Sequence, residues 1–233
     1  MTENIIEISN LKKKFPGVQA LKGIDLNIPK GMITGIVGPN GSGKSTLLKI
    51  ISGLIIKDEG QVQINRSHKD RNLMQDIAFL PEINHLYRWM KISDMLKFHK
   101  EQFSDFSMKK ASELIEFMNL KQEQKINNLS KGMVARLKLI LVLSRSAEIL
   151  ILDEPLAGID PASRERILES LIAEFDSENQ SIILATHEII EAERFLDNVI
   201  FMETGEILLA GNADDLRAEK GKSIRELIGE VFE

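Results

Sequence analysis

The feature that most constrains this chain is a glycine-rich loop between a predicted strand and a predicted helix. It fits the pattern G-x-x-x-x-G-K-S/T at every specified position and consists of Gly38, Pro39, Asn40, Gly41, Ser42, Gly43, Lys44, Ser45 and Thr46. Residues 32–37 form an apolar run typical of a short buried strand, and residues 44–51 carry apolar side chains at helical spacing. Loop N–H groups, the helix N-terminus and Lys44 can bind phosphates, and the Ser45 hydroxyl can bind Mg²⁺. The loop therefore predicts a nucleoside triphosphate site. A chance turn of small residues is the alternative, which the flanking strand and helix disfavour.

Composition places the chain among ordinary globular proteins, with 233 residues, 43% of them hydrophobic and 28% charged. Lys138, Arg145 and Glu148 interrupt its most apolar stretch, which stays below the roughly 18 residues of a membrane-spanning helix. The N-terminus lacks a secretory pattern and there are no cysteines, so we expect a cytosolic address. The net charge of −5 argues against a general affinity for nucleic acid. The one dense basic run, residues 12–14, is interpreted as a solvated strand end or loop.

The order of apolar patterns predicts an α/β fold in one domain. Alternating residues at 6–8 and 24–28 indicate antiparallel strands, and further strands are expected at 61–64, 77–80, 149–152 and 181–186. The last two are almost wholly apolar, as in parallel strands covered on both faces. Residues 198–209 predict a hairpin and residues 214–233 a helical tail. We therefore expect a phosphate-loop NTPase fold with a mainly parallel core sheet and an N-terminal antiparallel β subdomain.

A helical insert is expected in the middle of the chain, because residues 83–147 show helical spacing and no convincing strand. The catalytic core would then comprise residues 1–82 and 148–233, and residues 83–147 would form the helical subdomain. Within the insert, Ser130 precedes Lys131, Gly132, Met133 and an apolar helical run, and its side chain predicts an N-cap. A helix start of this kind is a second anion site. From the pattern alone it is only a capped helix.

Two carboxylates end the predicted strand 149–152. At the carboxyl end of a buried parallel strand, Asp153 can hold Mg²⁺ and Glu154 can polarise a water that attacks the γ-phosphate. An acidic turn is the alternative, and the phosphate loop elsewhere in the chain argues against it. His187 follows the strand 181–186, and this position favours a contact with the γ-phosphate over an ordinary surface role.

In combination these elements resemble the ATP-binding subunit of an ABC transporter over essentially the whole chain. The loop resembles Walker A, residues 149–154 resemble Walker B with its catalytic glutamate, and His187 matches the switch histidine. Residues 129–133 occupy the signature position, and residues 157–160 the position of the D-loop that crosses the dimer interface. Phe15 stands where the family places an aromatic on adenine, with partly buried packing as the alternative.

The chain departs from the family pattern at two places. Lys131 and Met133 replace the first glycine and the glutamine of the usual signature, so Ser130 and the Gly132 N–H are expected to keep the γ-phosphate contact. Lys131 either adds its ammonium or points to solvent. Glu82 stands at the Q-loop glutamine, where a carboxylate can bind Mg²⁺ but cannot donate a hydrogen bond. These departures resemble a bacterial branch of bacitracin-type and multidrug or peptide exporters.

The resemblance implies ATP and Mg²⁺ as cofactors and half of a composite site, completed by a second ATP-binding subunit in a homodimer or heterodimer. It also implies separate transmembrane permease subunits, a peripheral place on the cytoplasmic face of the membrane and no direct nucleic acid partner. We expect the permease to contact the region 82–97, through Leu86, Tyr87, Trp89 and Met90. Two alternatives stay open: a soluble ABC-type ATPase acting on DNA, ribosomes or cofactor assembly, and a regulatory ATP-binding subunit with low turnover.

Overall fold

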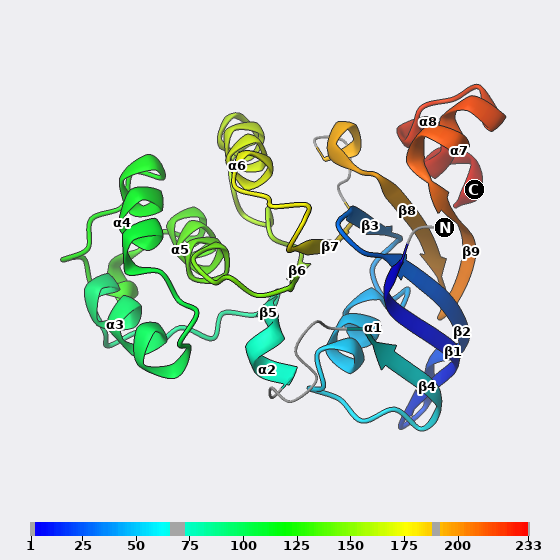
Figure 1. Ribbon diagram of the computed structural model, residues 1–233, viewed down its shortest axis with the longest axis horizontal. Coiled ribbons are helices and arrows are strands. Elements are labelled where there is room, and N and C mark those ends of the chain that lie inside the picture. Colours follow the sequence, from blue (N-terminus) through cyan, green and yellow to red (C-terminus); the bar gives the residue numbers. More distant parts are fainter. Residues whose placement is uncertain (1–2, 66–72, 188–191, 233) are drawn as a thin grey trace.

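Two sheets and two groups of helices build the molecule (Figure 1). The computed structural model describes residues 3–65, 73–187 and 192–232. Figure 1 shows α3 (Ile92–Gln102), α4 (Met108–Phe117) and α5 (Lys131–Leu143) at one end and a small antiparallel sheet at the other. The larger sheet lies between them. Within the described residues, no helix is both long and apolar enough to cross a membrane.

The smaller sheet has the strand order β2-β1-β4 and is antiparallel. Its strands are β1 (Asn4–Phe15), β2 (Val18–Pro29) and β4 (Glu59–Ile64), which confirms the antiparallel pattern expected from the alternating residues. Much of the basic run at 12–14 is neutralised here, because the ammonium groups of Lys12 and Lys13 each lie 2.7 Å from a carboxylate oxygen, of Glu59 and Asp58 respectively.

The larger sheet has the order β5-β6-β7-β3-β8-β9. Five of its strands are parallel, namely β5 (Ile77–Leu80), β6 (Ile149–Asp153), β7 (Ser181–Thr186), β3 (Ile33–Val37) and β8 (Asn198–Glu203). Edge strand β9 (Glu206–Asn212) pairs antiparallel with β8, which confirms the expected hairpin. All residues of β3, β6 and β7 are buried, as parallel strands covered on both faces require. This order places the carboxyl ends of β6, β7 and β3 next to one another.

Helix α1 (Lys44–Ile51) fills the space between the two sheets. Its side chains Leu47, Leu48 and Ile51 are buried in one apolar cluster with residues of β1 and β2 and with every second residue of the core strands. Because the sheet faces hold α1 from both sides, the position of the loop that precedes α1 is fixed by packing.

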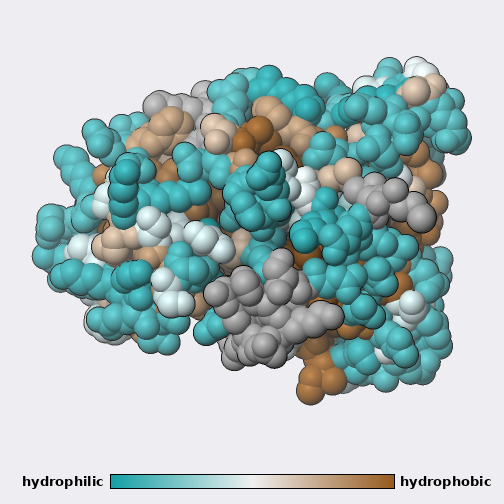
Figure 2. Space-filling model, viewed as in Figure 1, coloured by the Kyte–Doolittle hydropathy of each residue, from teal (hydrophilic) through white to brown (hydrophobic). Residues whose placement is uncertain are grey.

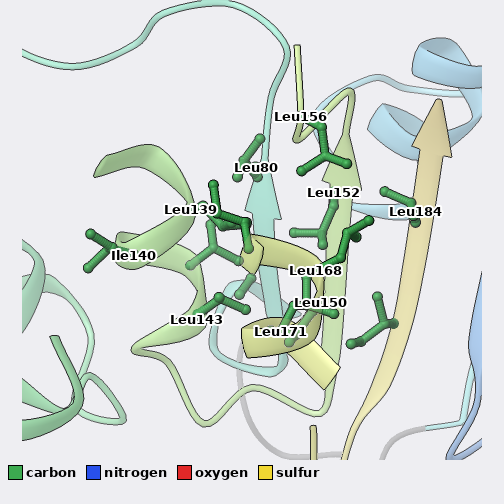
Figure 3. Close-up of a cluster of buried hydrophobic side chains, with 14 of the residues drawn as sticks. Leu80, Leu139, Ile140, Leu143, Leu150, Leu152, Leu156, Leu168, Leu171 and Leu184 are labelled. Carbon is green, nitrogen blue, oxygen red and sulfur yellow. The ribbon is translucent and has the colours of Figure 1, made fainter. Parts of the chain in front are cut away.

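The opposite face of the larger sheet packs on α5, α6 (Pro161–Ala173), α7 (Ala213–Lys220) and α8 (Ile224–Val231). Figure 3 shows leucines of β5, β6 and β7 meeting leucines of α5 and α6. The remaining elements are short: α2 (Leu73–Asp76) and the 3₁₀ turns Ile126–Asn128 and Glu193–Phe195. Figure 2 shows hydrophilic side chains over most of one face of the molecule, with hydrophobic ones in small clusters.

The helical insert is joined to the core by Arg145, which follows α5. Its guanidinium contacts both carboxylate oxygens of Asp105 at 3.0 Å and donates to the backbone oxygens of Gln75 and Ile77 at 2.9 and 3.3 Å. A buried charge of this kind is stable only when it is paired and hydrogen-bonded, and both conditions are met.

The tail is helical, as its pattern predicts. It forms two helices, because Gly221 adopts a left-handed conformation with φ 63° that ends α7. Ser223 then starts α8 by accepting a hydrogen bond from the Glu226 N–H, while the Glu226 carboxylate accepts one from the Ser223 N–H. The predicted division of the chain at residues 82 and 148 stays a prediction.

Candidate functional site

The glycine-rich loop connects β3 to α1, as its sequence context predicts. Gly41 and Gly43 have φ angles of 82° and 105°, which L-residues with side chains rarely adopt. At Gly43, a Cβ atom would also lie 2.7 Å from the backbone oxygen of Ala20. Glycine is therefore required at Gly43 by conformation and by space, and the turn aims the start of α1 at the carboxyl edge of the sheet.

Lys44 is the first residue of α1 and its side chain is buried in the loop. Its Nζ donates to the backbone oxygens of Gly38 at 2.7 Å and Pro39 at 3.1 Å. Burial lowers the pKa of this ammonium, and the carboxylates of Glu154, Asp153 and Glu82 act in the opposite direction. The loop thus holds the Lys44 ammonium beside its own peptide groups. A positive charge at this place is what the binding of a polyphosphate requires.

Ser45 and Asp153 form the oxygen pair expected to hold a metal. The Ser45 hydroxyl donates to Asp153 Oδ1 at 2.9 Å, and Asp153 Oδ2 is buried without a hydrogen-bond partner among the described residues. Burial raises the pKa of Asp153, although the bond from Ser45 and the charge of Lys49 lower it. Mg²⁺ takes oxygen ligands of this kind, and an unpaired buried carboxylate oxygen fits such a cation.

Glu154 is tied to His187 across the ends of β6 and β7. Glu154 has a φ of 50°, an unusual value for a glutamate, and its N–H donates to the Ala185 oxygen at 2.9 Å. His187 Nδ1 lies 2.8 Å from Glu154 Oε1, and the Thr186 hydroxyl donates to Oε2 at 3.1 Å. This backbone turn and these bonds aim the carboxylate at the same edge where Lys44 and Ser45 stand.

The predicted signature segment stands at the start of α5 and is not bonded to the phosphate loop of the same chain, within the described residues. Ser130 is the N-cap, since its Oγ accepts from the Met133 N–H at 3.2 Å. A Cβ atom on Gly132 would lie 3.2 Å from the backbone oxygen of Gly158, so this segment borders residues 157–160. Within the described parts of the chain, no hydrogen bond or ion pair joins residues 130–132 to the phosphate loop.

Phe15 and Glu82 make no hydrogen bond with the side chains of the five groups just described, within the parts of the chain that the structure describes. Phe15 ends β1 with 41% of its surface exposed, and the Lys13 ammonium is 5.3 Å from the ring centroid. The Glu82 side chain is exposed, and its charge acts on Lys44, Asp153 and Lys138. Both residues keep the surface access that their predicted roles require, and those roles stay predictions.

The sequence pattern assigns no role to two residues that lie near the site, Thr186 and Lys138. Thr186 holds Glu154 from β7, and Lys138 in α5 donates to the Glu82 backbone oxygen at 2.8 Å. Lys138 is the one charged residue in the apolar second half of α5, residues 137–143, and that exception was the available signal. Thr186 ends a buried strand and carried no comparable signal.

This site defines a phosphate-loop nucleoside triphosphatase. It combines a strand–loop–helix phosphate site with a Ser45–Asp153 pair and a Glu154–His187 pair, all at the edge of one mainly parallel sheet. The family model described as ABC transporter matches residues 21–157, and the chain belongs to this family. It is an ATP-binding subunit of an ABC transporter and an ATPase.

Relatives and solved structures of this family are similar over nearly the whole chain. The linearmycin resistance ATP-binding protein LnrL of Bacillus subtilis is 30% identical, covering 93% of this chain and 72% of LnrL. The lantibiotic transport ATP-binding protein SrtF of Streptococcus pyogenes is 31% identical over 90% of this chain and 92% of SrtF. A dimeric structure of the ATP-binding cassette MJ0796 in a post-hydrolysis state, bound to ADP and Pi, is 26% identical with a TM-score of 0.77. It covers 89% of this chain and 98% of that one.

Proposed function

We propose that this subunit dimerises around Mg-ATP and drives a separate transmembrane permease that exports peptides, antibiotics or other small molecules. The observation that carries the proposal is the convergence of Lys44, Ser45, Asp153, Glu154 and His187 at neighbouring strand ends. The names of the relatives LnrL and SrtF, which refer to linearmycin resistance and lantibiotic transport, support an exporter.

Each group at the sheet edge has a distinct role in this account. Lys44 leaves the Gly38 and Pro39 oxygens and donates to the outer phosphates, while the loop N–H groups hold the rest of the polyphosphate. Glu154 accepts a proton from the attacking water, and His187 holds the carboxylate and contacts the γ-phosphate. Phe15 stacks on the adenine.

Ser45 and Asp153 would hold Mg²⁺, with Glu82 reaching it from the loop after β5. Bound there, the cation neutralises charge on the phosphate oxygens. The chain's own contribution is a buried carboxylate with one unpaired oxygen, positioned by a serine on α1.

A second subunit supplies the missing half of the site. Ser130, Lys131 and Gly132 present a capped helix start, with free N–H groups, that is not joined to this chain's own loop. They would close over the phosphates held by another copy or by a related subunit. The dimeric structure of MJ0796 supports this arrangement.

The permease would bind beside Glu82, where Ile83, Tyr87 and Trp89 are 67%, 47% and 73% exposed. The expected contact set needs a correction, because Leu86 is buried and Met90 packs against the core. An exposed aromatic pair, with Tyr87 and Trp89 ring centroids 6.1 Å apart, suits a protein interface. The subunit would then lie on the cytoplasmic face of the membrane as a peripheral protein.

An ATPase assay tests the catalytic part of the proposal. Lys44→Ala should lower turnover on the order of 100-fold or more, because a phosphate-binding cation is removed. Lys57→Ala, at an exposed position in the loop before β4, is the matched control and should keep wild-type turnover. Equal turnover in all three proteins would contradict the assigned site.

Co-purification from detergent-treated membranes tests the permease part. The wild-type chain should bring down a polytopic membrane protein, and the double variant Tyr87→Ala, Trp89→Ala should lose most of it. Ile56→Ala removes another strongly exposed apolar side chain and serves as the control. Repeated absence of a membrane partner, with salt-sensitive binding to nucleic acid or ribosomes instead, would favour a soluble ATPase.

A further inference from the structure

Lys138 is a buried lysine, whereas most lysines lie at the protein surface. It lies in α5 with 6% of its surface exposed, and its neighbours along the helix, Leu137 and Leu139, are fully buried. Placing an ammonium there costs free energy that a leucine would not cost, unless the charge is hydrogen-bonded and balanced. The position of its partner therefore shows where the charge acts.

That partner is the backbone of Glu82, in the loop after β5. Lys138 Nζ donates to the Glu82 oxygen at 2.8 Å. Burial lowers the pKa of Lys138, and the carboxylates of Asp153 and Glu82 raise it, so both carboxylates lie within range of its charge. Lys138 is thus a cation of the helical insert that lies beside the predicted metal ligands.

The same helix carries the predicted signature segment at its start. Lys138 follows Ser130 by eight residues, which is about 12 Å along the axis of a helix. Glu82, Lys131, Lys138 and Ala157 line one groove of about 420 Å³. One rigid element therefore touches both the segment that would close over a partner's ATP and the loop that carries Glu82.

We propose that Lys138 is a positioning residue for ATP hydrolysis: it fixes the Glu82 segment to α5 and so sets where the Glu82 carboxylate stands at the Mg²⁺ site. This inference rests on the proposed function and adds to it a residue that the site motifs do not contain. Movement of α5 as the signature segment engages a second subunit would carry Glu82 with it. Lys138 acts through Glu82 and does not itself touch substrate.

Substitutions of Lys138 test the positioning role. Lys138→Met fills the same space without the ammonium, so ATP affinity in the absence of Mg²⁺ should stay within about twofold, while kcat falls by about tenfold or more. Lys138→Arg keeps a charged donor and should restore at least half of the turnover. Lys109→Met, at an exposed position on α4, is the matched control and should behave as wild type.

Thermal unfolding gives a readout that does not depend on turnover. At saturating ATP, the Mg²⁺ concentration for half-maximal stabilisation should rise several-fold in Lys138→Met and return toward wild type in Lys138→Arg. If the Met variant does not fold, Lys138→Gln takes its place, because its shorter amide does not reach the Glu82 oxygen.

A double-mutant cycle with Glu82→Ala separates positioning from general damage. If Lys138 acts through Glu82, Lys138→Met should cause no further loss of turnover, and no further Mg²⁺ shift, in the Glu82→Ala background. Additive losses, or wild-type turnover and Mg²⁺ dependence in Lys138→Met, would overturn the inference. A wild-type chain without any ATPase activity would instead contradict the proposed function, and the Mg²⁺ titration would still decide the role of Lys138.

Discussion

His187 Nδ1 lies 2.8 Å from Glu154 Oε1, and the His187 N–H donates to the same oxygen at 3.1 Å. The other carboxylate oxygen accepts from Thr186 at 3.1 Å. A glutamate that follows β6 is therefore held through both oxygens by the end of β7. Any displacement of one strand end relative to the other would change the aim of the carboxylate.

Glu154→Gln should lower kcat by about 10²- to 10⁴-fold, because an amide cannot accept the proton of the attacking water. ATP affinity should stay near wild type, since Lys44 and the loop are unchanged. Turnover and nucleotide binding measured on the same preparation check this. Glu178→Gln, in an exposed turn, is the control, and a Glu154→Gln variant with wild-type kcat would remove Glu154 from the mechanism.

His187→Ala should reduce kcat by about 10- to 100-fold, because the carboxylate loses its 2.8 Å partner while the Thr186 bond remains. Thr186→Val should have a smaller effect of the same kind, and the melting temperature of both variants should change little. If Thr186→Val proved as damaging as His187→Ala, a contact of the imidazole with the γ-phosphate would be unnecessary to explain the loss.

Asp153→Asn should keep or raise the melting temperature of the nucleotide-free protein. Burial raises the pKa of Asp153, so the ionised group costs stability in the folded state, and this cost grows as the pH rises through the folded pKa. The amide keeps an acceptor for Ser45 and removes the charge. Hydrolysis should nevertheless fall on the order of 100-fold, since the metal loses a ligand. A clear drop in melting temperature would contradict the unpaired state of Oδ2.

His99 should make the protein less stable in acid. Burial is the main cause that lowers its pKa to about 4, with the charges of His85 and Arg145 contributing. The unfolded state, with a pKa of about 6.5, binds the proton first, so this contribution is complete above pH 6.5 and is lost between pH 6.5 and 4. At pH 5 the stability lost through His99 amounts to about 2 kcal/mol. Comparing urea unfolding at pH 7 and pH 5, His99→Phe should lose less stability than wild type; equal losses would contradict the shift.

The strands and helices around the phosphate loop could be predicted because their patterns are local. The helix 44–51 and the strands 77–80 and 181–186 have the boundaries expected from the apolar runs. Gly221, in contrast, divides the tail into two helices, because a single left-handed residue outweighs an amphipathic pattern that continues on both sides. The exposed residues of the region 82–97 also could not be separated from buried ones, since Leu86 and Trp89 are both apolar and only packing distinguishes them.

The convergence of the site depends on strand order, which no local pattern contains. Motifs placed Asp153, Glu154 and His187 at strand ends, but the pairing of Ser45 with Asp153 required the strand order β6-β7-β3. The bond from Lys138 to Glu82 joins residues 56 positions apart and needed the packing of α5 on the sheet. The sequence pattern therefore located the chemical groups, and the tertiary arrangement supplied their partners.

The central claim, that Gly38 to Thr46 form half of a site completed by a second subunit, is tested most directly by the mass of Glu154→Gln in solution. Light scattering with saturating Mg-ATP should give twice the 26.3 kDa of the chain, and without nucleotide it should give a monomer. Ser130→Arg in the same background should remain monomeric, because a bulky side chain would block closure over the phosphates. A Glu154→Gln protein that binds Mg-ATP tightly and stays at 26.3 kDa would contradict a site shared between two copies of this chain.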